Sequence, residues 1–403
     1  LMEFSINDSI GSIYSALVES GADVYCFSCY IWNIEIILKA AELIKKAMPN
    51  IVIIFGGPES GYNSDELLKK YNFIDTIIRG EGEIIIGKVL ELIQQGKRPN
   101  RFYQGECVDL NSLKFPYTTL DIENLKNKIL YFETSRGCPF RCAYCLSSAD
   151  SNGIRYFPME YVKKGFKFFF DKKVPLVKLI DRTFNCDSKR AVEIVNYIIE
   201  NSTATKVHFE IEASILTDEL ISVLNSAPKD MFQIEVGVQT INHEALTAVN
   251  RNYDLEKIRY NIRRLTEPKN IHIHLDLIAG LPFEDYNSFI KSFNFVYSMS
   301  PDMLQLGFLK VLKGTQVSER FTSDIKYAEF PPYEVISTKW ISASELLKLK
   351  KVENAVDMFY NSGKFFNSIR SISEKPPYDN NPYSLFEQLG EKVKSSEKAG
   401  KLA

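Results

Sequence analysis

The chain has 403 residues, of which 45% are hydrophobic and 25% charged, a composition typical of globular proteins with two or three domains. Its 49 basic and 51 acidic residues nearly cancel, which argues against a general nucleic-acid-binding surface and an acidic tail. The sequence contains neither an apolar run of about 18 residues nor a basic leader followed by an apolar stretch. We therefore expect no membrane span and no signal peptide, and we expect the protein to be cytoplasmic.

Strands and helices are predicted to alternate through the first hundred residues. Apolar strands are expected at 1–6, 24–31, 51–57 and 73–80, and helices at 9–20, 34–48, 65–71 and 83–95. Continuous apolar strands between helices are typical of a parallel sheet that is covered on both faces. We therefore predict a doubly wound α/β domain, flavodoxin- or Rossmann-like, over residues 1–96.

A second alternation follows a segment without periodicity. Residues 97–130 contain two prolines and short polar clusters, and they are expected to form a linker. From 131 to 315, six strand–helix units predict an open (βα)6 partial TIM barrel. The expected strands are 131–137, 176–184, 206–213, 232–240, 271–282 and 303–312. Residues 316–403 are predicted to be a helical appendage with a loose tail.

Three of the seven cysteines, Cys138, Cys142 and Cys145, follow the first barrel strand with CxxxCxxC spacing. In a reducing compartment, such a cluster indicates metal binding or redox chemistry. Three thiolates from one loop suit an iron–sulfur cluster and leave one iron open to a substrate. Zinc would require a fourth ligand nearby, and no histidine lies within 60 residues. The other cysteines are scattered: Cys26, Cys29, Cys107 and Cys186.

The cysteine motif, with the aromatic Tyr144 before its last cysteine, stands at the head of six strand–helix units. This arrangement resembles the radical S-adenosylmethionine (SAM) enzymes over about residues 125–315. The resemblance implies that the three cysteines hold a [4Fe–4S] cluster whose open iron binds the amino and carboxylate groups of SAM. It also implies that an electron from the cluster cleaves SAM, and that the resulting 5′-deoxyadenosyl radical abstracts a hydrogen atom.

The resemblance assigns SAM contacts to the ends of the barrel strands. Asp181 stands where the family contacts the methionyl amino group, although its segment IDRTF departs from the usual GGE. Ile278 to Leu281 resemble the family's fifth-strand segment, whose backbone faces the adenine. The predicted SAM-binding residues are Tyr144, Asp181, Glu210, Glu235, Gln239, Asp276, Ile278 and Gly280.

Several of these side chains are carboxylates, which are costly to bury unless they are paired. Strand alternation places Glu210 and Glu212 on one face and Phe209 on the other. Two alternatives remain open for the glutamates: they face the barrel interior, or they contact lysines and arginines of the outer helices. Asp276 is either catalytic or a structural partner of an arginine.

A doubly wound domain ahead of the barrel resembles the cobalamin-binding branch of the radical SAM enzymes. The match rests on SCYIWN at 28–33, GGPESGY at 56–62 and RGEGE at 79–83. The glycines permit a positive φ and a close backbone approach, which a large planar ligand would require. The resemblance implies cobalamin contacts from Ser28, Tyr30, Trp32, Gly56, Gly57, Pro58, Glu59, Gly80, Glu81 and Gly82.

Two features depart from other cobalamin domains. No histidine precedes His208, so the DxHxxG motif that supplies a histidine ligand to cobalt is missing. The chain starts at Leu1 instead of a methionine, and the first strand and helix of the domain are expected to lie upstream. We therefore expect a fragment whose N-terminal sheet has an unpaired strand edge.

Together these features predict an enzyme that uses a [4Fe–4S] cluster, SAM and cobalamin to methylate or rearrange a small-molecule or metabolite substrate. A flavodoxin or ferredoxin is the expected electron donor. The alternatives are a radical SAM enzyme without cobalamin and an iron–sulfur sensor or electron carrier without turnover. A methylthiotransferase would need three further cysteines in the N-terminal domain, where only Cys26 and Cys29 occur. These two are expected to pack as small hydrophobic residues.

Overall fold

The structure is a computed structural model that describes residues 1–125, 128–148, 153–202 and 204–400. None of the described helices is both long enough and apolar enough to cross a membrane. The chain divides into two compact units. Unit 1 comprises Leu1–Ser112 and Ala328–Glu334, and unit 2 comprises Leu113–Tyr327 and Val335–Ala403.

Unit 1 is built on a parallel sheet with the strand order β1-β2-β3-β4. Apolar side chains of α1, α2 and α4 cover one face of this sheet, and α5 covers the other. The prediction of a doubly wound α/β domain is therefore confirmed. The strands are β1 (Val24–Ser28), β2 (Val52–Gly56), β3 (Thr76–Arg79) and β4 (Phe102–Gln104), and the helices are α1 (Ile10–Ser20), α2 (Ile34–Ala47), α3 (Pro58–Tyr62), α4 (Ser64–Lys70) and α5 (Glu83–Gln94).

The strand predicted over residues 1–6 is absent. Ser5 and Asp8 form a turn instead, in which the Ser5 amide donates to the Asp8 carboxylate at 2.6 Å. Ser9 then caps α1 by accepting a hydrogen bond from the Ser12 amide at 3.1 Å. Short polar side chains that bond to nearby backbone favour turns and helix caps over strands. The upstream strand that we expected stays a prediction.

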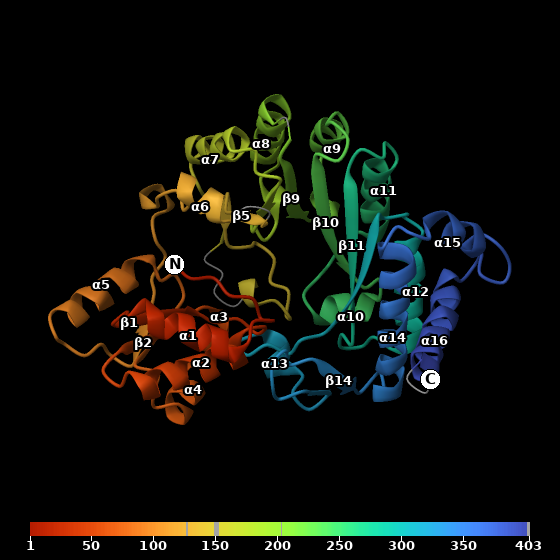
Figure 1. Cartoon of the computed structure of the whole chain (residues 1–403). Coiled ribbons are helices and arrows are strands. Elements are labelled where there is room, and N and C mark those ends of the chain that lie inside the picture. The colour runs from red at the N-terminus through yellow and green to blue at the C-terminus, as the bar shows by residue number, and fades with distance from the viewer. Residues whose placement is uncertain (126–127, 149–152, 203, 401–403) are drawn as a thin grey trace. The chain divides into compact units, whose positions relative to one another are not determined.

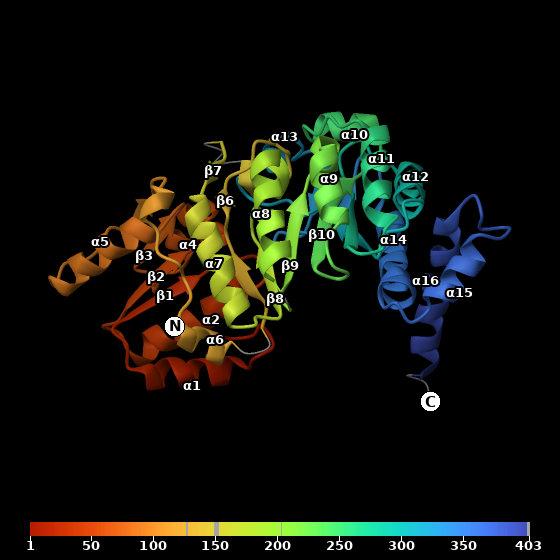
Figure 2. The ribbon, with the colours of Figure 1, turned by 90° about the horizontal axis from the view of Figure 1, so that it is seen from above.

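Unit 2 contains a six-stranded parallel sheet with the order β12-β11-β10-β9-β8-β5. Neighbours in the sheet follow one another along the chain, and its first and last strands do not pair, so the sheet is open as predicted. Helices flank its outer face (Figures 1 and 2). The strands are β5 (Leu130–Phe132), β8 (Leu176–Leu179), β9 (Lys206–Ile211), β10 (Phe232–Gln239), β11 (His272–Ala279) and β12 (Met303–Phe308). The helices are α7 (Met159–Asp171), α8 (Ser188–Asn201), α9 (Asp218–Asn225), α10 (His243–Ala248), α11 (Leu255–Thr266) and α12 (Tyr286–Tyr297).

The two faces of this sheet differ in polarity because side chains alternate along each strand. In β10, four apolar side chains are buried, and Gln233, Glu235, Gly237 and Gln239 between them are half-buried. β9 has the same pattern, with Phe209 fully buried. We call the polar face, opposite the outer helices, the inner face.

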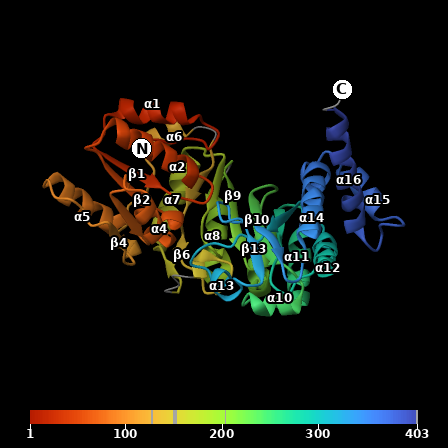
Figure 3. The same ribbon diagram turned by 90° about the horizontal axis from the view of Figure 1, so that it is seen from below.

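The remaining elements of unit 2 are short or lie after the sheet. The C-terminal tail, which we predicted to be loose, is instead helical, and α16 lies beside α14 (Figure 3). Phe386 of this helix is fully buried, so apolar packing holds it in place. The elements are α6 (Thr119–Asn124), β6 (Ser135–Arg136), β7 (Arg155–Tyr156), α13 (Gln316–Arg320), β13 (Ile325–Tyr327), β14 (Val335–Thr338), α14 (Ala343–Val356), α15 (Phe366–Ser373) and α16 (Pro382–Gly400).

Candidate functional site

The loop that carries the three predicted cluster ligands follows β6 in unit 2. Cys142 is buried, and Cys138 and Cys145 are partly exposed. The Cys145 amide donates to the Cys142 carbonyl at 3.1 Å, and the Ala143 amide donates to the Val249 carbonyl at 2.9 Å. The loop therefore has a defined conformation, tied to the segment after α10, from which it presents three soft ligands.

The side chain of Arg251 joins this loop to the sheet, and our sequence analysis missed it. Its Nη1 donates to the Tyr144 hydroxyl at 2.7 Å and lies 3.8 Å from Cys142 Sγ. Its Nη2 contacts Glu212 Oε2 at 3.2 Å and donates to the Gly237 carbonyl at 2.6 Å. The guanidinium therefore links the cysteine loop, the end of β9 and β10. In the sequence, Arg251 is one arginine within a polar segment, and no motif distinguishes it from the others.

The three thiols affect one another electrostatically. Burial raises the pKa of Cys142, the positive charge of Arg251 opposes this rise, and the neighbouring thiols of Cys145 and Cys138 add to it. The charges of Cys138 and Cys145 thus both act on Cys142.

Two buried polar atoms near Arg251 have no hydrogen-bond partner among the described residues: Arg251 Nε and Gln239 Oε1. Gln239 ends β10 with a φ of +69°, and its amide lies over Gly237, where a Cβ would come within 2.0 Å of Gln239 Nε2. An unmet donor and an unmet acceptor beside three thiols suit a ligand that carries both kinds of group. The methionine part of SAM, with its carboxylate and amino groups, fits this requirement.

A fourth thiol, that of Cys186, lies near Cys138. Thr183 Oγ1 is 3.6 Å from Cys138 Sγ and also bonds to Cys186. Burial raises the pKa of Cys186 to about 12, and the charge of Cys138 adds to this rise. No sequence pattern groups Cys186 with the motif, because the two lie on different strand–helix units.

Asp181 holds the segment that precedes the cysteine loop. Its carboxylate accepts hydrogen bonds from the Thr134 amide at 2.8 Å, the Ser135 hydroxyl at 2.8 Å and the Thr134 hydroxyl. The residue is only 1% exposed. Its predicted contact with SAM stays a prediction, and in this structure its carboxylate serves as an anchor for that segment.

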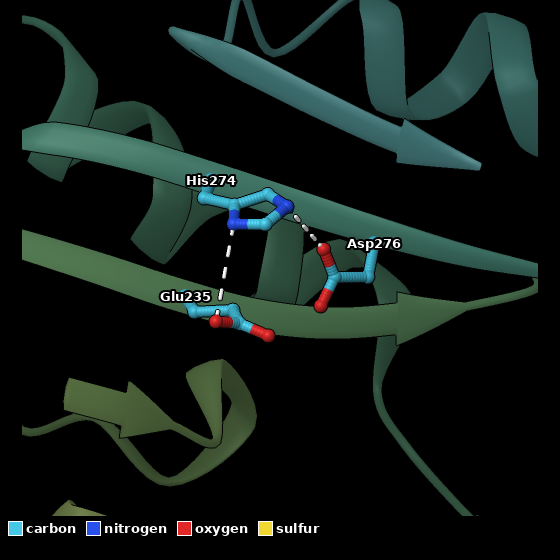
Figure 4. A group of neighbouring side chains, drawn as sticks. All are labelled: Glu235, His274 and Asp276. Atoms are coloured by element: carbon cyan, nitrogen blue, oxygen red, sulfur yellow. Dashed lines mark ion pairs between the residues drawn. The ribbon is translucent and has the colours of Figure 1, made fainter. Parts of the chain in front are cut away.

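A polar network crosses the inner face from β8 to β11. Glu235 Oε2 lies 3.4 Å from Lys178 Nζ, 3.1 Å from His208 Nε2 and 3.9 Å from His274 Nδ1. His274 Nε2 lies 2.7 Å from Asp276 Oδ1 (Figure 4). Ligand atoms of Glu235, His274 and Asp276 fall within 4.8 Å of one another, a spacing that a metal ion would also require. Glu235, His274 and Asp276 already form ion pairs with one another. The partner of Asp276 is therefore a histidine and not an arginine.

Two opposed carboxyl groups on the inner face titrate very differently. Glu210 lies directly across from Glu235 in the register of β9 and β10. Burial and the charge of Glu235 raise the pKa of Glu210 to about 7. Burial would also raise the pKa of Glu235, but the hydrogen bond with His208 and the charge of Lys178 outweigh it and lower this pKa to about 2. The inner face thus has one carboxylate that is charged at neutral pH beside one with a pKa of about 7.

The predicted adenine-facing residues end β11. Ile278 is half-buried on the inner face. Gly280 has a φ of +86°, and a Cβ there would come within 2.8 Å of Val335 Cγ1, so glycine is required at this turn. Contacts of these residues with adenine stay predictions.

Glu284 lies between β11 and α12 and links the loops that follow β10 and β11. It is 1% exposed and accepts hydrogen bonds from the hydroxyls of Thr240 and Ser292. Asn242 adds a second link, because its Nδ2 donates to the Phe283 carbonyl at 3.0 Å. Burial raises the pKa of Glu284 to about 8, so its carboxyl group is mostly protonated at pH 7.

We expect the free energy of unfolding of Glu284→Gln to fall less steeply with rising pH than that of the unaltered chain. The folded chain holds this proton up to about pH 8, whereas the unfolded chain releases it near the ordinary value of 4.5. The contribution of Glu284 to the free energy of unfolding therefore falls as pH rises between these values, by up to about 1.4 kcal/mol per pH unit, and is constant above them. Urea unfolding of both chains from pH 5 to 8.5 measures the difference. The exposed Glu160→Gln is the control, and equal slopes for Glu284→Gln and the unaltered chain would contradict the expectation.

The predicted cobalamin loops follow β1, β2 and β3 of unit 1. The rings of Tyr30 and Trp32 stack with their centroids 4.5 Å apart, and Trp32 is 61% exposed. Gly57 and Gly80 have positive φ, whereas Gly82, with a φ of −92°, does not. A Cβ at Gly57 would lie 2.6 Å from the Cys29 carbonyl oxygen, so the backbone of the domain itself requires glycine there.

The other predicted cobalamin-binding residues lie along the same edge of the sheet. Glu81 Oε2 accepts a hydrogen bond from the Val108 amide at 2.8 Å. Ser28 and Gly56 end their strands, Pro58 starts α3 and Gly82 precedes α5. An exposed aromatic stack at the carboxyl edge of a parallel sheet fits a large planar ligand. Unit 1 contains no histidine, so it offers none to cobalt.

The two cysteines of unit 1 differ in burial. Cys29 is fully buried, as predicted, whereas Cys26 is exposed, so the prediction that both pack as apolar side chains is wrong for Cys26.

Three family models match the chain. Residues 3–90 match the B12 binding domain, residues 132–296 match the radical SAM superfamily, and residues 322–399 match a protein family of unknown function, DUF4080. The fold and the three-thiol loop therefore define a radical SAM enzyme. More particularly, the chain carries a radical SAM domain together with a B12-binding domain. Its cofactors are accordingly a [4Fe–4S] cluster, SAM and cobalamin.

Two methyltransferases are among the curated proteins to which the chain is similar. It is 25% identical over 300 residues to the 2-(S-pantetheinyl)-carbapenam-3-carboxylate methyltransferase of Streptantibioticus cattleyicolor. It is 24% identical over 302 residues to the cobalamin-dependent radical SAM methyltransferase TokK of Streptomyces tokunonensis. Each match covers 66% of this chain and 44% of the relative, so the chain spans less than half the length of these proteins.

A solved structure shares the fold. The radical SAM methyltransferase TsrM from Kitasatospora setae, with cobalamin and a [4Fe–4S] cluster bound, matches with a TM-score of 0.66 at 13% identity. The match covers 81% of this chain and 71% of TsrM.

Proposed function

We propose that the protein is a cobalamin-dependent radical SAM methyltransferase that methylates a carbon or phosphorus centre of a small-molecule substrate. The observation that carries this proposal is the presence, in one chain, of a B12-binding domain and a three-thiol loop held by Arg251. The similarity to two curated methyltransferases supports methylation over rearrangement or cyclisation.

The chain's own residues suit the three cofactors. Cys138, Cys142 and Cys145 hold the cluster, and Arg251 and Gln239 offer an open donor and an open acceptor to SAM. When bound, the cluster and SAM supply a radical that abstracts hydrogen, and cobalamin supplies the methyl group. Since burial strengthens electrostatic interactions, the buried guanidinium of Arg251 holds a SAM carboxylate more firmly than an exposed one would.

The inner face indicates a polar substrate. Lys178, His208, Glu210 and Glu235 line it as charged or titratable groups, and the apolar side chains face the outer helices. A substrate without hydrogen-bonding groups would leave these side chains desolvated and poorly satisfied.

Anaerobic reconstitution with iron, sulfide and hydroxocobalamin tests the proposal. We expect one [4Fe–4S] cluster and one cobalt per chain, with a flavodoxin, a ferredoxin or dithionite as the electron source. Methyl transfer consumes two SAM molecules: one gives up its methyl group to leave S-adenosylhomocysteine, and the other is cleaved to 5′-deoxyadenosine. If the chain takes up its full complement of iron but no cobalt, the alternative of a radical SAM enzyme without cobalamin is favoured. Iron without any SAM cleavage would favour a sensor or electron carrier.

A further inference from the structure

A short segment that follows the barrel in sequence belongs to unit 1. Ala328–Glu334 is the loop between β13 and β14, and it groups with the N-terminal domain. The loop is closed by two hydrogen bonds: the Ala328 amide donates to the Glu334 carbonyl at 2.9 Å, and the Tyr333 amide donates to the Phe330 carbonyl at 2.9 Å. The segment thus has a defined conformation, and it lies within the region of unknown function at residues 322–399.

Tyr333 connects this segment to a predicted cobalamin loop. Its hydroxyl donates a hydrogen bond to Glu59 Oε1. Tyr333 is 5% exposed and Glu59 is 8% exposed, so both groups are buried. Hydrogen bonds with an ionised partner are stronger than neutral ones, and they are costly to break when buried.

Glu59 lies where the strand ends of unit 1 meet. It is the second residue of α3, directly after the Gly56–Gly57 turn that ends β2. Its amide donates to the Cys29 carbonyl at 3.2 Å, which ties it to the end of β1 as well. The side chain of Tyr333 thus fixes a carboxylate at the edge that carries the predicted cobalamin contacts.

The backbone of Tyr333 is in an unfavourable conformation. Its φ is +59°, a left-handed value that bulky residues rarely adopt. Such strain persists where the surrounding structure holds it, and it gathers at sites of function. Burial and the neighbouring Glu59 also raise the pKa of Tyr333 far above its usual value, so its hydroxyl remains a donor.

We propose that Tyr333 is a positioning residue of the cobalamin site, so that the C-terminal region of unknown function supplies part of the B12-binding domain. The hydroxyl holds Glu59 and the start of α3 in place. Through Glu59 it also holds the Gly56–Gly57 turn before α3, which is part of the predicted cobalamin edge. This inference rests on the cobalamin step of the proposed function.

The test is the titration of Tyr333→Phe with hydroxocobalamin, followed by visible absorbance, in the whole chain with its cluster. We expect the affinity for cobalamin to fall about tenfold or more, because a buried hydrogen bond to Glu59 is lost. The electron paramagnetic resonance spectrum of the cobalamin that still binds, after reduction to the Co(II) state, should also change. Iron content and SAM cleavage, which depend on unit 2, should stay at the level of the unaltered chain.

Matched variants separate positioning from general stability. Tyr25→Phe removes another buried tyrosine hydroxyl of unit 1, which donates to the Leu17 carbonyl at 2.8 Å within the apolar core. Its cobalamin affinity should be unchanged. Glu59→Gln should weaken binding as Tyr333→Phe does, and the double variant should lose little more than the weaker single variant. Equal affinities for Tyr333→Phe, Tyr25→Phe and the unaltered chain would overturn the inference. If the unaltered chain takes up no cobalamin, both the inference and the cobalamin step fail.

Discussion

Replacing Cys142 with alanine should remove the cluster and with it the reductive cleavage of SAM. Cys142 is the buried thiol of the three, and its loop is tied to the segment after α10. Loss of an outer-sphere partner of a metal ligand typically weakens metal binding about 10- to 100-fold, and loss of a ligand itself should exceed this. We therefore expect the formation of 5′-deoxyadenosine with dithionite to fall by more than about 100-fold. Iron content and 5′-deoxyadenosine, measured after anaerobic reconstitution, give the result.

Cys186→Ala is the matched control, since it removes a neighbouring thiol that lies outside the motif. Cys186 lies near Cys138 and shares Thr183 with it. If the cluster has three protein ligands, this variant keeps its iron and its SAM cleavage. Retained 5′-deoxyadenosine in Cys142→Ala, or loss of the cluster in Cys186→Ala, would contradict the assignment of the ligands.

Replacing Arg251 with methionine should strongly destabilise unit 2. The guanidinium pairs with Glu212 at 3.2 Å, and both side chains are at least 90% buried. Methionine would leave the Glu212 carboxylate without a counter-charge in the interior. Removing one partner of a buried ion pair typically costs about 3–5 kcal/mol. Urea unfolding without cofactors, followed by circular dichroism, measures the free energy of unfolding.

Two variants test whether the unpaired charge is the cause. The double variant Glu212→Gln and Arg251→Met should recover part of the loss, because no buried charge is left alone. Lys163→Met breaks an exposed pair with Glu193 at 2.6 Å and should cost less than about 1 kcal/mol. Equal losses of unfolding free energy for Lys163→Met and Arg251→Met would show that the buried pair stabilises the chain no more than the exposed pair does.

Local patterns in the sequence were sufficient for the fold class and the cluster ligands. The alternation of apolar strands and helices depends on residues a few positions apart, so it predicted both parallel sheets. Cys138, Cys142 and Cys145 lie within one loop, and their spacing alone indicated a cluster. Local reading failed where tertiary packing overrides composition: the polar C-terminal tail forms α16 because residues such as Phe386 are buried against neighbouring helices. It also failed at β4, which lies inside the segment expected to be a linker.

The partners of the site residues followed from the folded chain alone. Arg251 reaches Tyr144 and Glu212 because the ends of separate strand–helix units meet at one edge of the sheet. Glu235 meets His208 because of the register between β9 and β10, and a shift by one residue would turn its side chain to the other face. Contacts of this kind depend on strand order and register, which no short stretch of sequence encodes. The motif therefore identified the chemistry, whereas the three-dimensional arrangement determined which side chains surround it.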